Sequence, residues 1–239
     1  MAVITFSRQY GSRGDEVAER VREMLGYRLF DKRLMAQVAS ELGLSDNEIV
    51  DFSEENYKVR NFLERLFTRR SGRVVAETST WKEDPTGART VEVSRLDEEQ
   101  CIGMVKATIR AAHKQGNVVI VGRGGQVVLS EMPDTLHVRI EAPVGKRIQH
   151  VHYHEMTGLV ADLKRKRAEQ VVAERDRAAA AYLKRFYDVD WDDSSLYHLV
   201  INTSRCGTDA AAHMIVTAIS HLSPVETSSQ QPALTKAVA

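Results

Sequence analysis

Cysteine is scarce in this sequence: Cys101 and Cys206 are the only two among 239 residues, and neither belongs to a C-x-x-C pair. The pattern suggests no disulfide framework or structural zinc site, and we expect both thiols to be reduced, small core residues. The sequence also lacks the run of about 18 apolar residues that a membrane span requires, and no basic segment followed by an apolar run opens it. We therefore expect a soluble cytoplasmic protein.

Net charge is absent as well. The 33 basic and 33 acidic residues give a formal net charge of +0, so no overall field attracts nucleic acid or an anionic membrane. We expect neither partner, and nothing in the sequence indicates an obligate protein partner. Any anion site must therefore be local. The 43% of hydrophobic residues are enough for one substantial core.

The most informative pattern lies at the start of the chain. An apolar strand is predicted over residues 2–6, a glycine-bearing stretch follows over residues 7–16, and a helical pattern then runs to Gly26. A strand, a glycine turn and a helix in this order aim backbone N–H groups and a helix dipole at phosphate. The turn lacks the lysine and the Ser/Thr pair of G-x-x-x-x-G-K-[ST]. The order predicts a phosphate site, and an ordinary connection between a strand and a helix is the alternative.

Further strands alternate with helices along the chain. Short, unalternating apolar runs predict strands at residues 118–121, 136–140 and 199–203, and a last helix is predicted at residues 210–222. Strands that alternate with helices indicate a mostly parallel sheet with helices on both faces.

Two stretches differ from this pattern. Residues 45–95 give a weaker signal, which predicts a helix followed by a hairpin-like insertion around the turn-rich residues 84–87. Residues 223–239 are rich in Ser, Gln and Pro and lose all periodicity, so we predict a disordered tail.

Several motifs resemble those of one enzyme family. Residues 122–129 read Gly-Arg-Gly-Gly-Gln-Val-Val-Leu and resemble the G-R-D-I-G-T-V-V motif of cytidylate kinases, and residues 136–147 resemble the strand–A-S-x-E-E-R region that follows it. The chain is thus similar to the cytidylate kinase-like branch of the nucleoside monophosphate kinases over most of residues 1–222, most weakly at 45–95. The lid and the I-D-T-S strand of that branch are matched by Asp176, Arg177, Tyr182, Asp190, Trp191, Tyr197 and residues 201–204.

This resemblance implies a fold and a domain organisation. The implied fold is the P-loop kinase α/β fold, a three-layer α/β/α arrangement with a mostly parallel sheet, a helical and hairpin insertion, and a helical lid. One nucleotide kinase domain would cover residues 1–222, with the acceptor-side insertion at 45–95, the lid at 156–190, and the tail at 223–239.

The resemblance also implies an activity. This is ATP-dependent phosphorylation of a nucleoside monophosphate, with CMP or dCMP as the expected acceptor, Mg²⁺ as the cofactor and nucleotides as the partners. The alternative is a regulatory or interaction protein that retains the nucleotide-binding fold with little or no turnover.

The resemblance places an ATP site on the first turn. Gly11, Ser12, Arg13 and Gly14 match the phosphate loop of the family, with Arg13 in place of its third glycine. Arg13 either supplies the missing cation or obstructs the loop with its bulk. Asp15 and Glu16 stand where a Ser/Thr metal contact is usual. Carboxylates hold Mg²⁺ through oxygen, so Asp15 is our candidate ligand, whereas Glu16 is also favoured there by the helix dipole alone.

Acceptor and lid residues follow from the same resemblance. Asp31, Arg123 and Asp176 are candidate acceptor-binding residues, and the fork of Arg123 suits a phosphate bidentately unless it forms a structural ion pair. Arg175 is a candidate catalytic residue and Arg177 a candidate ATP-binding residue, although charged runs on helices are often solvated faces. The family's G-R-D aspartate and its second lid Asp and Arg are replaced by Gly124, Ala179 and Tyr182.

Overall fold

A five-stranded parallel sheet forms the centre of the computed structural model, which describes residues 2–30, 76–83, 89–96, 98–154 and 161–222. Its strand order is β2-β5-β1-β6-β7, and every pairing in it is parallel. The strands are β1 (Val3–Arg8), β2 (Arg28–Phe30), β5 (Val118–Val121), β6 (Thr135–Glu141) and β7 (Leu199–Asn202). The helices are α1 (Gly14–Leu25), α5 (Glu98–Gln115), α6 (Gly125–Val128), α7 (Val144–His154), α8 (Ala161–Tyr187) and α9 (Thr203–Ser220), with a short 3₁₀ helix, η1 (Ser194–Leu196).

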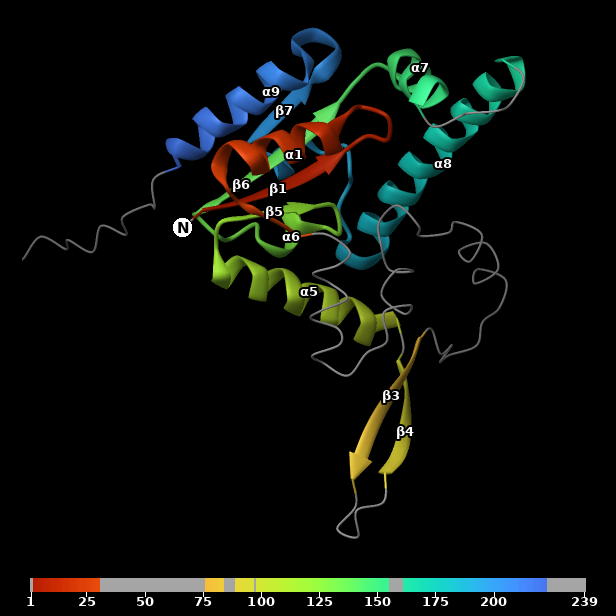
Figure 1. Cartoon of the computed structure of the whole chain (residues 1–239), viewed down its shortest axis with the longest axis vertical. Helices are drawn as coiled ribbons and strands as arrows, with labels where there is room; N and C mark the ends of the chain where they lie inside the picture. The colour runs from red at the N-terminus through yellow and green to blue at the C-terminus, as the bar shows by residue number, and fades with distance from the viewer. Residues whose placement is uncertain (1, 31–75, 84–88, 97, 155–160, 223–239) are drawn as a thin grey trace, which may run out of the picture.

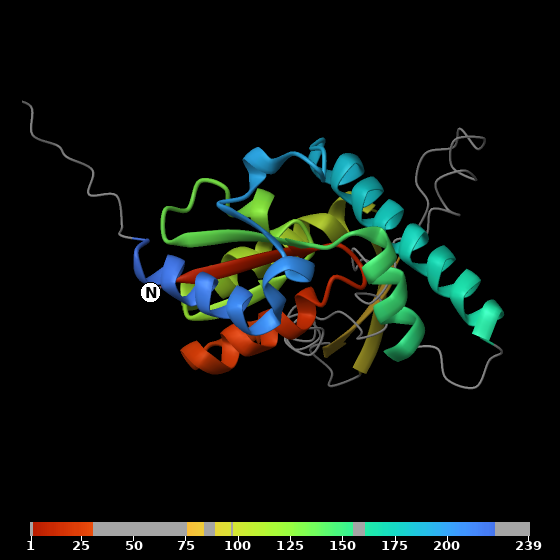
Figure 2. The same cartoon turned by 90° about the horizontal axis from the view of Figure 1, so that it is seen from above.

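Helices cover both faces of this sheet (Figure 1, Figure 2). The α1 and α9 helices pack on one face, where Ile4 and Phe6 of β1 join a core cluster with Val17 and Ile215. The other face packs against α5, α6 and α8, with Val3 of β1 in the second cluster. Since β1 is buried on both faces, its residues do not alternate between buried and exposed: Val3, Ile4 and Phe6 are buried, and so are the polar Thr5 and Ser7. The three-layer α/β/α fold predicted from the sequence is confirmed.

The ends of two helices test the local sequence signals. Gly26 caps α1 with φ 65°, and its N–H bonds back to the last turn, as the sequence predicts. The α9 helix begins at Thr203, earlier than the predicted start at residue 210. There the Asn202 side chain accepts a hydrogen bond from the Ser204 N–H, and Gly207, at φ 75° and ψ 171°, interrupts the helix. The expected boundary was wrong because the capped first turn directly follows the apolar strand.

The predicted hairpin is present and projects from the body of the molecule (Figure 1). Its strands, β3 (Ala76–Glu83) and β4 (Arg89–Leu96), pair antiparallel. The candidate residue Asp31, the predicted helical part of the insertion and the predicted tail at 223–239 lie outside the described residues. Within the described ranges, no helix is long and apolar enough to span a membrane.

Candidate active site at the carboxyl edge of the sheet

The first βα connection forms a tight loop, residues 9–14, which we call the glycine loop. It follows the central strand β1 at the carboxyl edge of the sheet and leads into α1. Gly11 has φ 78°, and Arg13, the N-cap of α1, has φ 65° and ψ 22°. The loop therefore places backbone N–H groups at the N-terminus of a 12-residue helix, where the helix dipole favours an anion.

Two positions in this loop have no room for a side chain. A Cβ at Gly11 would lie 2.8 Å from the carbonyl oxygen of Arg147 on α7, and a Cβ at Gly14 would lie 2.5 Å from Cβ of Arg8. Gly11 also has a backbone conformation that disfavours other residues. Both glycines are thus required by close packing of the loop against its own scaffold.

The glycine loop is clamped by a largely buried ion pair between α7 and α8. Asp176 Oδ1 accepts a hydrogen bond from the Tyr10 N–H at 3.0 Å, and its Oδ2 lies 2.6 Å from Nη1 of Arg147. Arg147 Nη1 also donates to the Tyr10 carbonyl at 3.1 Å, while its Nε donates to the Ala142 carbonyl at 2.9 Å. Both peptide groups of Tyr10 are therefore satisfied by side chains from outside the loop.

Arg147 was not among the residues that sequence reasoning assigned to the site. The available signal was its place in the strand–A-S-x-E-E-R match. Its side chain is only 7% exposed, and a guanidinium that is buried this far requires an acidic partner and further acceptors. Asp176 and two backbone carbonyls supply them.

A third support comes from the start of α9. Thr203 Oγ1 donates to the Ser12 carbonyl at 2.6 Å, and the Ser12 N–H donates to the Gln9 carbonyl at 3.1 Å. The Gln9 side chain in turn accepts the Ala142 N–H at 3.2 Å. The Ser12 side chain is buried, with its hydroxyl directed at the Ile140 carbonyl. Ser12 thus helps to hold the loop through its backbone N–H and carbonyl, whereas its hydroxyl points into the core.

Charged side chains follow the loop on the first turn of α1. Arg13 donates from Nε and Nη2 to Glu16, with a shortest distance of 2.7 Å, and this hydrogen bond raises the pKa of Arg13 above its usual value. Asp15 Oδ1 accepts from Arg8 Nε at 3.0 Å, yet the Asp15 side chain is 72% exposed. Among the described residues, no group of three or more His, Cys, Asp or Glu side chains could hold a metal ion. A metal here would therefore need further oxygen ligands beyond the protein, such as those of a phosphate chain.

Arg123 occupies the turn after β5, the neighbour of β1 in the sheet. Its backbone has φ 60°, its side chain is buried, and its guanidinium carbon lies 5.7 Å from the ring centroid of Phe30, the last residue of β2. The next residue, Gly124, has φ 72° and lies against the ring of Tyr187. The structure thus brings Arg123 to the carboxyl edge on the side of β1 toward β2.

The remaining candidate residues lie on α8. Arg175 has its guanidinium carbon 5.6 Å from the ring centroid of Tyr10, in the glycine loop. Arg177 is exposed and donates from Nε to the Ala173 carbonyl at 3.1 Å. Ala179 and Tyr182 are buried core residues. The α8 helix therefore brings Arg175 and Asp176 to the glycine loop, and it uses the two altered lid positions for packing.

The segment after α8 is fixed to the sheet by a buried arginine. Arg139 of β6 bonds to the Trp191 carbonyl and, at 2.5 Å, to Asp192, and its guanidinium carbon lies 4.7 Å from the Trp191 ring centroid. Trp191 Nε1 donates to Ser7 Oγ of β1 at 2.8 Å. This network sets where α8 ends relative to the strand that carries the glycine loop.

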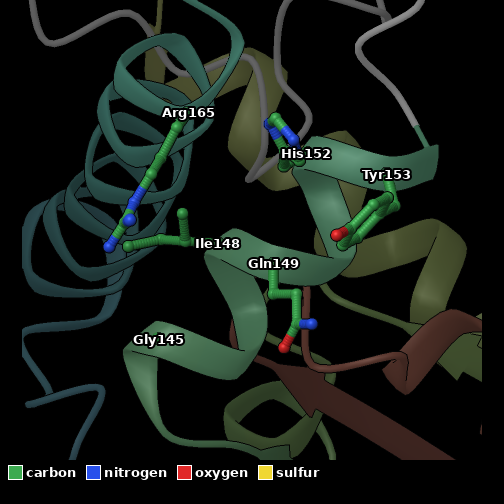
Figure 3. Close-up of a pocket in the computed structure, with 6 residues that line it drawn as sticks. All are labelled: Gly145, Ile148, Gln149, His152, Tyr153 and Arg165. Atoms are coloured by element: carbon green, nitrogen blue, oxygen red, sulfur yellow. The ribbon is translucent and has the colours of Figure 1, made fainter. Parts of the chain in front are cut away.

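A pocket of about 360 Å³ lies between α7 and α8 (Figure 3). Arg147 and Val151, the residues of α7 nearest Gly11, lie four positions apart and form a different stripe of that helix. The pocket is therefore separate from the glycine loop, and none of the candidate residues lines it. It is lined by Gly145, Ile148, Gln149, His152, Tyr153 and Arg165.

Comparisons with known proteins agree with this architecture. A cytidylate kinase of Methanocaldococcus jannaschii is 27% identical over 187 residues, which are 75% of this chain and 94% of that protein. A cytidylate kinase of Thermococcus kodakarensis is 33% identical over 114 residues, 47% of this chain and 54% of that protein. As in the latter case, the chain spans about half the length of most of the curated relatives it matches.

A solved structure shares the fold. An uncharacterized protein from Eubacterium ventriosum superposes with a TM-score of 0.58 at 18% identity, over 92% of this chain and 99% of that chain. The model of the cytidylate kinase-like family matches residues 3–205, a span that includes all five strands of the sheet and both helices that clamp the glycine loop. The chain therefore belongs to the cytidylate kinase-like family.

Proposed function

We propose that this protein transfers the γ-phosphoryl group of ATP to a nucleoside monophosphate, with CMP or dCMP as the acceptor. The observation that carries this proposal is the glycine loop, whose backbone is held at the N-terminus of α1 by Asp176, Arg147 and Thr203. Phosphoryl transfer depends on positioning and on neutralising the charge of the phosphate oxygens, and needs little covalent chemistry from the protein. A rigid set of N–H donors is suited to that task.

On the ATP side, the glycine loop binds phosphate oxygens and two arginines contribute positive charge. Arg13 stands at the N-cap of α1 with its side chain 44% exposed, and its bonds to Glu16 use Nε and Nη2. Arg175 extends over the Tyr10 ring at the edge of the loop. We assign Arg13 the role of the absent lysine, and Arg175 that of a cation closing over the phosphates. The ATP-binding role of Arg177 stays a prediction, because it lies two positions from Arg175 on α8 and so points away from it.

Asp15 is the proposed protein ligand for Mg²⁺, which neutralises phosphate charge when bound. Its carboxylate fits this role because it is largely exposed on the first turn of α1 and bonds to Arg8 through Oδ1 alone. Glu16 fits less well, since both of its oxygens accept hydrogen bonds from Arg13. Arg8 orients the Asp15 carboxylate beside the loop.

On the acceptor side, we assign Arg123 to the monophosphate. Its turn follows β5 rather than β1, so its guanidinium approaches the crevice from the other side of the glycine loop. The acceptor role of Asp31 stays a prediction, and so does that of Asp176. The hydrogen bond from the Tyr10 N–H to Asp176 also supports a second role for Asp176, in holding the loop that we assign to ATP.

The second candidate is a nucleotide-binding protein with little turnover. It is favoured by Ala179 and Tyr182, which fill the core where the related lid carries a charged pair. It is also favoured by the pairing of Arg13 with Glu16, which competes with any phosphate for the guanidinium.

A coupled assay of ADP formation with Mg²⁺ and each nucleoside monophosphate separates the two candidates. We expect the highest kcat/KM with CMP or dCMP. Tight ATP binding in calorimetry without ADP formation for any monophosphate would favour the second candidate. Absence of both binding and turnover would refute both.

A further inference from the structure

Tyr187, the last residue of α8, touches the turn that carries Arg123 in two ways. Its hydroxyl donates a hydrogen bond to the Arg123 carbonyl at 3.0 Å. Its ring fills the space beside Gly124, where a Cβ would lie 2.5 Å from Cε2 and 2.7 Å from Cζ of the tyrosine. Tyr187 and a side chain at position 124 therefore exclude each other. This gives a physical reason for glycine at the position where the related motif has aspartate.

The Arg123 backbone needs such support. At φ 60° it is in the left-handed region, which a residue with a Cβ occupies only where its surroundings hold it. The direction of a side chain follows its backbone, and that of Arg123 is buried above the Phe30 ring. The Tyr187 hydroxyl donates to the carbonyl of this same residue. It therefore fixes the peptide group next to the Arg123 Cα, and so the direction in which the side chain leaves the backbone.

Tyr187 is itself firmly placed. Lys106 of α5 has its amino group 4.9 Å from the Tyr187 ring centroid, and the Tyr182 ring lies 6.0 Å away. On the same helix, about three turns or 16 Å earlier, Asp176 holds the glycine loop. The α8 helix therefore contacts both proposed substrate sites, at Asp176 and at Tyr187.

We propose that Tyr187 is a positioning residue, which aims Arg123 at the acceptor phosphate and ties that aim to the position of α8. The proposal rests on the proposed function where it assigns Arg123 to the monophosphate. Tyr187 does not touch substrate; it acts through the Arg123 carbonyl.

The first test is Tyr187→Phe, which keeps the ring and removes the donor. We expect the KM for CMP to rise about 3- to 10-fold, the effect of one lost hydrogen bond. The KM for ATP and kcat should stay within about 2-fold of wild type. Tyr153→Phe, the same change at an exposed position of α7, should leave both KM values and kcat unchanged. An equal rise in both KM values would mark Tyr187 as a general structural residue and overturn the proposal.

A double-mutant cycle tests the route of the effect. If Tyr187 acts through Arg123, Tyr187→Phe should add no further loss of CMP binding once Arg123→Ala is present. Independent, additive losses in the double variant would contradict the proposal.

A substrate-free measurement separates this proposal from the proposed function. The Nε–Hε NMR resonance of Arg123, identified by its loss in Arg123→Lys, should shift in Tyr187→Phe and stay in place in Tyr153→Phe. If wild type neither binds nor phosphorylates any monophosphate, the proposed function fails, and this resonance still decides the positioning role. An unchanged Arg123 resonance in Tyr187→Phe would overturn it.

Discussion

The carboxylate of Asp176 and the backbone N–H of Tyr10 are hydrogen-bonded at 3.0 Å although 166 positions of the chain separate them. The bond joins α8 to the loop after β1, and the ion pair of Asp176 with Arg147 adds α7 to the same junction. The α7 and α8 helices and the glycine loop therefore meet at one carboxylate, and changes in either helix should affect the loop.

Asp176→Asn should weaken ATP binding and stability together. The amide still offers an oxygen to the Tyr10 N–H, but it leaves the guanidinium of Arg147 buried without its charged partner. Breaking a buried pair in this way costs about 3–5 kcal/mol, and we expect the low end because the Asp176 side chain is 20% exposed. We expect urea unfolding to report that loss, and calorimetry to report ATP binding weakened by more than about tenfold.

Asp209→Asn is the matched control, because Asp209 pairs with Arg20 at a site where both side chains are exposed. It should change stability by less than about 0.5 kcal/mol. Equal effects of the two substitutions would contradict the clamp.

Gly11→Ala should displace the glycine loop. The new Cβ would meet the Arg147 carbonyl at 2.8 Å, and alanine disfavours φ 78°. We expect calorimetry to show ATP affinity reduced by more than about tenfold. Gly103→Ala, on α5 with open space around its Cβ, should leave the affinity unchanged. Wild-type affinity in Gly11→Ala would mean that phosphate binds elsewhere.

Arg13→Ala should lower kcat by more than about tenfold, equivalent to about 1.4 kcal/mol in the barrier. The reason is the loss of the cation that stands for the missing lysine. The control is Arg20→Ala on the same helix, whose side chain is half exposed and paired with Asp209; its kcat should match wild type. Unchanged or faster turnover in Arg13→Ala would show that Arg13 is only tolerated bulk.

Arg123→Ala should weaken binding of the monophosphate and leave ATP binding intact. Arg123→Lys should not restore it, because lysine keeps the charge and loses the planar fork. Separate titrations of CMP and ATP by calorimetry measure both effects, with Arg110→Lys on exposed α5 surface as the control. Selective loss of ATP binding would instead place Arg123 on the ATP side.

The sequence predicted the sheet and the glycine loop because both depend on short-range patterns. Buried parallel strands such as β5 are continuously apolar, and a strand, glycines and a helix follow one another directly in the chain. The clamp could not be found this way. The resemblance singled out Asp176 for the acceptor and left Arg147 within a matched segment, but the pairing of the two residues and their bonds to Tyr10 arise only from tertiary contact between α7, α8 and the glycine loop. The motif alone likewise indicates only the loss of an aspartate at Gly124, whereas the reason for glycine there is the Tyr187 ring, which comes from a distant part of the chain.

Stability should fall as the pH falls below neutrality because of His137. Burial in β6, together with electrostatic repulsion from the neighbouring His198 imidazole, lowers the pKa of His137 from 6.5 to about 4. At any pH between these two values, His137 is mostly protonated in the unfolded chain and mostly neutral in the folded chain. The stabilising contribution is complete above about pH 6.5 and is lost progressively as the pH falls toward 4.

Between about pH 7.5 and 5 this linkage amounts to about 2 kcal/mol in the free energy of unfolding. Urea titrations across that range measure it. His137→Asn can still offer a polar atom to the hydroxyl of Thr5, which bonds to His137 Nδ1 at 2.7 Å, but it cannot titrate. Its stability should therefore depend less on pH by about that amount. His213→Asn, at an exposed position of α9, should show the same dependence of unfolding free energy on pH as wild type. If His137→Asn also shows the wild-type dependence, the buried imidazole is not the cause of that dependence.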